Sequence, residues 1–288
     1  MRHNISASTF IRDTYRGAFC LFESMASLLP FVDDMTIIDV GSTDGTLETL
    51  RDIASSNPRI KIRTSRFSRI DASAFADIAN ECVSSWSHEV GMFWQADEIW
   101  HQDLLRIMDA KLASGSDDMI FWRYQLKNNF QRMKWPPHPV HRVGRKDNFK
   151  FVDDGMNSNR VWDAKICSTY DCGWFTKWGS DFADDYTRLP TNEMILDVSA
   201  IGGFIENIVG KRKLHAPMWH EKPNVEGVPV DKWYQSEKNN PEWRQTTTSF
   251  NIPEIMRWHV SRPTYDLRQE LLDALKNDNT EELIGYEN

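Results

Sequence analysis

Short apolar runs alternate with helix-like segments over roughly the first hundred residues, and this alternation constrains the fold more than any other feature. The apolar runs are brief and rich in β-branched residues, which favours buried strands over helices. The segments between them carry apolar residues at helical spacing. The expected strands cover residues 5–11, 35–40, 59–63 and 90–94, and the expected helices cover residues 17–29, 47–53 and 73–82. This order predicts a mostly parallel sheet with helices on both faces.

Past residue 112 the pattern is less regular. We expect further strands over 119–126 and 194–201, a helix over 204–214 and a last amphipathic helix over 268–275. The basic segment 127–150 is expected to be a loop, and the acidic tail after the last helix is expected to fray. No internal repeat or linker divides the 288 residues, which favours a single domain.

Composition excludes several classes of protein. The net charge of −8 argues against a duplex-binding protein, which would show a basic face. No run approaches the ~20 apolar residues that span a bilayer, although peripheral contact with a membrane stays open. The N-terminus lacks the apolar core of a signal peptide. The 4 cysteines are scattered without a CxxC pair, and free thiols in a reducing cytoplasm fit this pattern best.

The segment Gln95–Glu98 follows the apolar run 90–94 and brings an amide and two carboxylates together. In open α/β sheets ligands bind outside the carboxyl ends of strands, so these side chains are expected at a crevice. Their oxygens are hard ligands that suit Mg²⁺ or Mn²⁺ carried in with a diphosphate. An equally good interpretation is structural, with Asp97 and Glu98 capping a following helix over 103–112.

Asp39 ends another apolar strand, just before the glycine-containing turn Gly41–Thr46. A carboxylate at this point can accept the ring N–H of a nucleotide base or a ribose hydroxyl. It can instead serve only as a cap of the turn, because aspartates commonly bind the backbone of such loops. The turn lacks the lysine of a P-loop, and a GxGxxG pattern is absent. A Walker ATPase or a dinucleotide dehydrogenase is therefore disfavoured.

Two of these motifs, in this order, resemble those of family 2 glycosyltransferases with the GT-A fold. Thr36–Thr46 is similar to the family's nucleotide-sugar strand and turn, an apolar run followed by Asp-Asp-Gly-Ser-Thr-Asp-Gly-Thr. Gln95–Glu98 is similar to the family's Asp-Ala-Asp-Glu, a form of its DXD motif. Residues 73–81 lie where the family places a helix ending in Ala-Arg-Asn, and His141–Lys146 resembles a later Arg-Leu-Phe-Arg-like segment. The resemblance is good over residues 5–105 and thin to about 155.

The resemblance implies a Rossmann-like GT-A fold of the α/β class, with a mostly parallel sheet flanked by helices and a less regular C-terminal acceptor region. It implies one domain over 1–288, with a nucleotide-binding half at 1–115 and an acceptor-side half at 116–288 that includes the C-terminal helix and tail. The implied reaction transfers a sugar from a UDP-sugar to a hydroxyl of a carbohydrate, lipid or protein acceptor. Mn²⁺ or Mg²⁺ would be the cofactor, and nucleic acid is not an expected partner.

By the same resemblance, residues at the strand ends would hold the donor. Thr9 and Asp39 would hold the uracil, and Asp97 would coordinate the metal that bridges the diphosphate. An arginine of the basic loop would close over the base or the phosphate. The implied nucleotide-binding residues are Thr9, Asp39, Ser42, Arg66, Arg69, Gln95, Ala96 and Asp97.

Two positions depart from the family pattern. Val40 replaces the second Asp of the turn, and one carboxylate is enough for the base. Gln95 replaces the first Asp of the DXD motif, and the lost charge lowers the expected affinity for metal. A catalytically weak or inactive protein that binds UDP or glycan is therefore an alternative. A sugar-phosphate nucleotidyltransferase is another, but it would need a glycine-rich basic loop after the first strand, where the chain has Arg12–Tyr15.

The acceptor side must come from the second half of the chain. An inverting transfer needs a carboxylate as general base on the acceptor hydroxyl. The candidate acids are Asp154, Asp184, Asp185 and Glu206. Asp185 is favoured by its distance beyond the metal motif, with Asp154 next, and Glu206 is assigned to acceptor binding. For each of them a solvated surface acid is the structural alternative.

Two histidines flank a tryptophan further along. His215 and His220 would supply another metal ligand or a phosphate contact, or they are ordinary hydrogen-bonded histidines. Trp219 lies between them and would form the floor of an acceptor-sugar site, unless it packs in the core.

Overall fold

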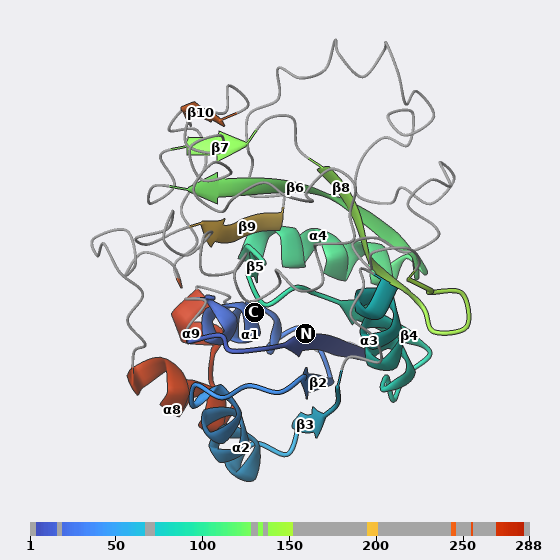
Figure 1. Cartoon of the computed structure of the whole chain (residues 1–288). Helices are drawn as coiled ribbons and strands as arrows, with labels where there is room; N and C mark the ends of the chain where they lie inside the picture. The colour runs from blue at the N-terminus through green and yellow to red at the C-terminus, as the bar shows by residue number, and fades with distance from the viewer. Residues whose placement is uncertain are drawn as a thin grey trace.

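The computed structural model describes residues 4–15, 19–66, 73–127, 132–134, 138–151, 195–200, 243–245, 255 and 269–284. Within these residues strands and helices alternate at first, and strands predominate later (Figure 1). The strands are β1 (Ile5–Ile11), β2 (Asp34–Asp39), β3 (Ile60–Thr64), β4 (Val90–Phe93), β5 (Glu98–Ile99), β6 (Met119–Lys127), β7 (Arg132–Lys134), β8 (His138–Arg145), β9 (Ile195–Ala200) and β10 (Trp243–Gln245). The helices are α1 (Leu21–Leu28), α2 (Thr46–Ser56), α3 (Ser73–Ser84), α4 (Gln102–Ala113), α8 (Gln269–Asn277) and α9 (Glu281–Ile284).

The described strands form one 10-stranded sheet, with the order β10-β7-β6-β8-β4-β1-β2-β3 along its main path. The neighbours β3, β2, β1 and β4 all run parallel. Beyond them β8 is antiparallel to both β4 and β6, while β9 is parallel to β6 and antiparallel to β5. The predicted α/β fold, with its parallel strands and flanking helices, is confirmed, and a mixed second half of the sheet completes it.

Helices cover both faces of the parallel strands, over two separate cores. On one face Ala7 and Ile37 pack with the buried sides of α1, α2, α4 and α8. On the other face Ile38 and Phe93 pack with α3 and with Phe151. Successive residues of a strand point to opposite faces, which is why Ile37 and Ile38 belong to different cores. The apolar strands of the first hundred residues are buried on both sides for this reason.

Two glycines face each other where β4 pairs with β8. Gly91 lies opposite Gly144 in the register. A Cβ on Gly91 would lie 2.0 Å from Trp86 Cδ2, and one on Gly144 would lie 2.5 Å from Phe149 Cδ2. The two rings pack edge to face with centroids 5.3 Å apart, and only glycines leave room for them. Trp86 and Phe149 thereby pack in the second core beside β4, the strand that leads into the Gln95–Glu98 motif.

The C-terminal helices complete the first core. α8 and α9, red in Figure 1, lie beside the blue helices α1 and α2. Asn57 after α2 donates its side-chain N–H to the carbonyl of Leu275 at 2.8 Å. Arg59 forms an ion pair with Asp278 and donates to the carbonyl of Leu29 at 2.6 Å. The last helix predicted from the sequence, over 268–275, is thus observed as α8 and packs against α1 and α2.

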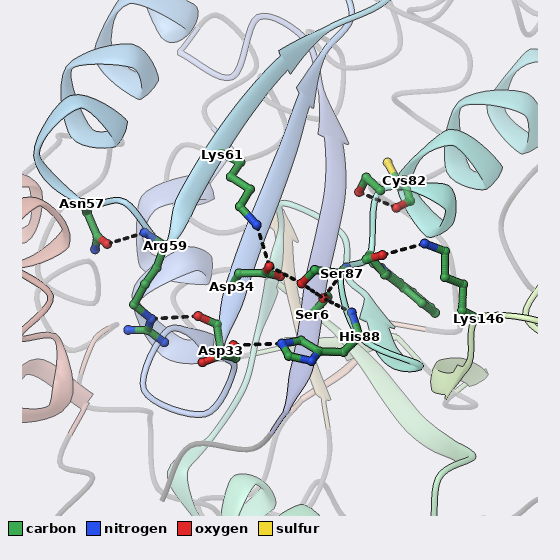
Figure 2. Close-up of polar contacts among 12 residues, drawn as sticks. Ser6, Asp33, Asp34, Asn57, Arg59, Lys61, Cys82, Ser87, His88 and Lys146 are labelled. Atoms are coloured by element: carbon green, nitrogen blue, oxygen red, sulfur yellow. Dashed lines mark hydrogen bonds and ion pairs between the residues drawn. The ribbon is translucent and has the colours of Figure 1, made fainter.

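Polar contacts join the opposite, amino-terminal ends of the parallel strands (Figure 2). Asp34 accepts hydrogen bonds from Lys61 Nζ at 2.7 Å and from the Ser87 hydroxyl. The backbone N–H of Ser87 donates to Ser6 Oγ at 2.9 Å. Burial alone would raise the pKa of Asp34, but hydrogen bonds from Lys61, Ser87 and Ser6 and the Lys61 charge outweigh it and lower that pKa.

Expectations for the less regular regions need correction. Segment 127–150 was expected to be a loop because it is basic, and this is wrong, since it contains β7 and β8. The basic residues suggested a segment in solvent, but Arg142 of β8 is buried in an ion pair. The acidic tail does not simply fray, because α9 forms there with Ile284 buried. The strand expected over 194–201 is observed as β9, while the helix expected over 204–214 lies outside the described residues.

Candidate functional site

The carboxyl ends of the parallel strands lie at one edge of the sheet. Ile11 of β1 lies opposite Asp39 of β2, which in turn lies opposite Thr64 of β3. β1 separates β2 from β4. Because neighbouring strands are about 4.8 Å apart, the strands that lead into Asp39 and into Gln95–Glu98 are roughly 10 Å apart. The two motifs are far apart in sequence but emerge at the same edge.

Asp39 uses its two carboxylate oxygens differently. Oδ1 accepts the backbone N–H groups of Gly41 and Ser42, both at 3.0 Å, so the turn-capping interpretation is correct for this oxygen. Gly41 has φ +99°, a conformation that favours glycine. Oδ2 is also buried, yet it has no hydrogen-bond partner among the residues that the structure describes. A buried acceptor without a donor is costly, and this oxygen can accept an N–H or O–H group of a ligand.

The loop after β1 is tied to the turn after β2 through Asp13. This residue is 1% exposed and has φ 48°, the left-handed region that aspartate tolerates better than most residues. Its Oδ1 accepts the N–H of Thr43 at 2.7 Å, and its own N–H donates to Ser42 Oγ at 2.8 Å. Thr46 Oγ1 accepts the N–H of Thr14 at 3.0 Å. The sequence analysis did not single out Asp13, and the signal that could have found it was an aspartate two residues after the end of an apolar strand.

Gln95–Glu98 forms a closed turn. The N–H of Glu98 donates to the carbonyl of Gln95 at 2.9 Å, and the N–H of Gln95 donates to Glu98 Oε2 at 3.1 Å. Ser24 of α1 donates its hydroxyl to the carbonyl of Glu98 at 2.6 Å. Ala96 is buried, and Gln95 and Asp97 are half-buried. Helix α4 begins at Gln102, and the Glu98 carboxylate binds Arg142 and the N–H of Gln95 instead of capping this helix.

Glu98 forms a fully buried ion pair with Arg142 of β8. Arg142 Nη2 donates to Glu98 Oε1 at 2.7 Å, and Arg142 Nε donates to Glu98 Oε2 at 2.9 Å. Both side chains have 0% exposure. The guanidinium also lies over the ring of Phe93, with Cζ 5.8 Å from its centroid. Glu98 therefore does not belong to the oxygen cluster expected to bind metal, because both of its oxygens are occupied by Arg142.

The Asp97 carboxylate and the Gln95 amide carry oxygens of the kind that bind a metal together with a ligand. Within the described ranges, no group of three or more His, Cys, Asp or Glu residues could hold an ion alone. Besides Glu98, which pairs with Arg142, the turn carries the side chains of Gln95 and Asp97. One or two protein oxygens combined with phosphate oxygens are a common arrangement for Mg²⁺. Among the described residues, the oxygens of this turn fit a metal that a diphosphate also binds.

Other predicted site residues lie near this edge or outside the described part of the chain. Thr9 is buried in β1 opposite Ile37, and its hydroxyl donates to the carbonyl of Phe10 at 3.4 Å. Arg66 is exposed and follows Ser65, whose N–H donates to the carbonyl of Asp39 at 2.9 Å. The residues outside the described ranges are Arg69, Asp154, Asp184, Asp185, Glu206, His215, Trp219 and His220. None of the described helices is long and apolar enough to cross a membrane.

Three solved structures are examples of proteins to which the chain is similar. TarS from S. aureus, in a structure with UDP, has 13% identity and a TM-score of 0.38, over 52% of this chain and 50% of that one. Glucosyl-3-phosphoglycerate synthase from Mycobacterium tuberculosis, with Mn²⁺, UDP and phosphoglyceric acid, has 14% identity and a TM-score of 0.35, over 53% and 60%. The mannosyltransferase PcManGT from Pyrobaculum calidifontis, with GDP-Man and Mn²⁺, has 15% identity and a TM-score of 0.39, over 58% and 52%. The aligned region therefore spans only about half of these proteins.

Sequence comparison identifies the family directly. No curated protein matches the chain. The family model described as "Glycosyl transferase family 2" matches residues 20–174, which include the turn after β2, the Gln95–Glu98 motif and β8. The match covers more than half of the chain, and it confirms the resemblance seen in the two motifs. This protein belongs to glycosyl transferase family 2.

Proposed function

We propose that this protein transfers a sugar from a UDP-sugar to an acceptor hydroxyl, with Mn²⁺ or Mg²⁺ bound to the diphosphate. Membership of a glycosyltransferase family supports sugar transfer as the reaction and disfavours nucleotidyl transfer. The observation that carries the choice of donor is the buried, unpartnered Oδ2 of Asp39 at the edge where the described parallel strands end. A nucleotide base would satisfy that oxygen with a ring N–H.

The geometry of Asp39 favours uracil over guanine. Oδ1 already accepts the N–H groups of Gly41 and Ser42, so Oδ2 is the oxygen left for a ligand. Uracil presents one ring N–H donor, whereas guanine presents a ring N–H and an amino group side by side. A single acceptor matches the first pattern and leaves a donor of the second without a partner, which costs affinity. Arg66, and Arg69 after it, would lie against the base or the phosphates.

Asp97 would hold the metal, with Gln95 as a neutral oxygen ligand or a partner of the ribose. When bound, the metal would offset the charge that develops on the departing UDP. On the protein side, Asp97 contributes a negative charge in a turn closed by hydrogen bonds. We also propose that Thr9 and Ser42 bind the UDP-sugar. Thr9 lies in β1 beside the strand of Asp39, and Ser42 lies in the turn that Asp39 caps.

The acceptor side rests on the sequence alone. We propose Asp185 as the general base, with Asp154 second, and His215 and His220 as further metal or phosphate ligands. Trp219 and Glu206 would contact the acceptor. In this scheme residues 1–115 bind the donor and residues 116–288 shape the acceptor side. A cytoplasmic location and peripheral contact with a membrane stay predictions.

Calorimetric titration tests the donor assignment. UDP, GDP and ADP are titrated into the protein with and without Mn²⁺. We expect UDP to bind most tightly and its affinity to rise with Mn²⁺. In Asp97→Ala the rise caused by Mn²⁺ should disappear, while the preference for UDP is kept because Asp39 is intact. Equal affinities for the three bases, indifferent to Mn²⁺, would refute the roles of both Asp39 and Asp97.

A protein that binds UDP without turnover is the second candidate. It is favoured by Gln95, which replaces an acid of the motif, and by the ion pair that occupies Glu98. Incubation with UDP-glucose, UDP-galactose and UDP-GlcNAc, followed by measurement of released UDP, separates the two. Release of UDP that depends on Asp97 supports the enzyme. Tight UDP binding without release, across donors and acceptors, supports the binder.

A further inference from the structure

The buried ion pair between Glu98 and Arg142 holds both ends of the segment that carries Asp97. Arg142 binds Glu98 through two N–H groups, and its guanidinium lies over Phe93, the last residue of β4. Glu98 Oε2 in turn accepts the N–H of Gln95. One side chain of β8, Arg142, thus contacts the segment at both of its ends, Phe93 and Glu98.

Stability alone does not account for such a pair. Removing two charges from water costs several kcal/mol per ion, and buried ion pairs can often be replaced by apolar residues without loss of stability. An arginine in such a pair fixes the orientation of its partner, because the planar fork of its guanidinium donates two hydrogen bonds to the carboxylate at once. The fork of Arg142 fixes the orientation of Glu98, and Glu98 fixes the backbone N–H of Gln95.

We infer that Arg142 and Glu98 are positioning residues, which hold the Gln95–Glu98 turn so that Asp97 meets the metal of the bound nucleotide. The role of Asp97 in this statement rests on the function proposed above. Neither Arg142 nor Glu98 touches the ligand, and both act through the turn. Outer residues that orient metal ligands typically contribute about 10- to 100-fold in metal affinity or activity.

The double variant Glu98→Met/Arg142→Met tests the inference. It removes both charges and keeps two long apolar side chains, so no charge is left buried without a partner and the fold is expected to survive. We expect the Mn²⁺-dependent affinity for UDP to fall about 10- to 100-fold, while the affinity for UDP without metal changes little. Amide hydrogen exchange of Gln95 and Glu98 should become faster, because the side-chain acceptor of the Gln95 N–H is gone.

Two further variants provide the control and the safeguard. Arg145→Met lies on the same strand but removes only exposed ion pairs, such as that with Glu89, and should change neither readout. Arg142→Lys keeps the charge and loses the fork, so it should fold even if the double variant does not, with the same two effects in weaker form.

The two readouts separate this inference from the proposed function. Wild-type exchange protection in a folded double variant, or in Arg142→Lys, would overturn the inference, and so would wild-type Mn²⁺-dependent binding. If the wild-type protein binds no UDP, the proposed function fails instead. Hydrogen exchange then still decides whether the pair holds the turn, because that measurement needs no ligand.

Discussion

Substitution of Asp39 by asparagine separates the two tasks of this side chain. The amide oxygen can replace Oδ1, because the N–H groups of Gly41 and Ser42 require an acceptor there. The amide nitrogen then takes the place of the buried, unpartnered Oδ2. The turn keeps its cap, but the amide N–H of asparagine now faces the position where we expect the ring N–H of the base, and two donors cannot bind each other. The variant should therefore fold normally and bind the nucleotide poorly.

The expected loss follows from one charge-assisted hydrogen bond. Such bonds contribute about 1.5–3 kcal/mol, which corresponds to a roughly 10- to 150-fold weaker affinity for UDP. Stability should change little, since the free protein loses a buried oxygen that had no partner among the described residues. Asp39→Ala also removes both capping bonds and should cost about 1–3 kcal/mol of unfolding free energy. Calorimetry measures the affinity, and urea unfolding measures the stability.

Asp34→Asn is the matched control, because Asp34 begins the strand that Asp39 ends. It lies in the polar network at the far end of the sheet (Figure 2), so its loss should lower stability and leave UDP binding unchanged. Wild-type affinity for UDP in Asp39→Asn would refute the assignment of Oδ2 to the base. An equal loss of affinity in Asp34→Asn would show that the effect is a general consequence of destabilisation.

Two further predictions concern the sheet. The lowered pKa of Asp34 means that its contribution to stability is present above the unfolded value of 3.8 and is lost as the pH falls through the folded value. Urea unfolding should therefore show a difference between wild type and Asp34→Asn that is constant above about pH 5 and shrinks below about pH 4, and a difference that grows in acid would contradict this sign. Gly91→Ala should cost about 1–3 kcal/mol of unfolding free energy, because the new Cβ would overlap a ring of Trp86 that is anchored by its 2.7 Å hydrogen bond to Ser8. An unfolding midpoint equal to that of wild type would show that the ring moves aside.

Local patterns were enough to predict most of the first hundred residues. Strands such as β1 and β2 were recognised because both of their faces are buried, so apolar residues follow one another along the chain. The turn after Asp39 was recognised because glycine and Asx chemistry act over a few neighbouring residues. The same approach failed for segment 127–150, because its basic residues suggested a loop in solvent. Strand β8 forms there through pairing with β4 and β6, of which β4 is distant in sequence.

The sequence by itself determined the alternation of elements, the family motifs and the two aspartates placed after apolar strands. Only the tertiary structure decided how the oxygens around them are used. Glu98 looked like a metal ligand beside Asp97 until Arg142, 44 positions away, was found to occupy it. Asp39 could equally have been a cap or a ligand, and it caps with one oxygen while the other stays buried without a described partner. The physical reason is that hydrogen-bond partners distant in sequence meet only when the sheet assembles, and no local pattern encodes which oxygen they leave free.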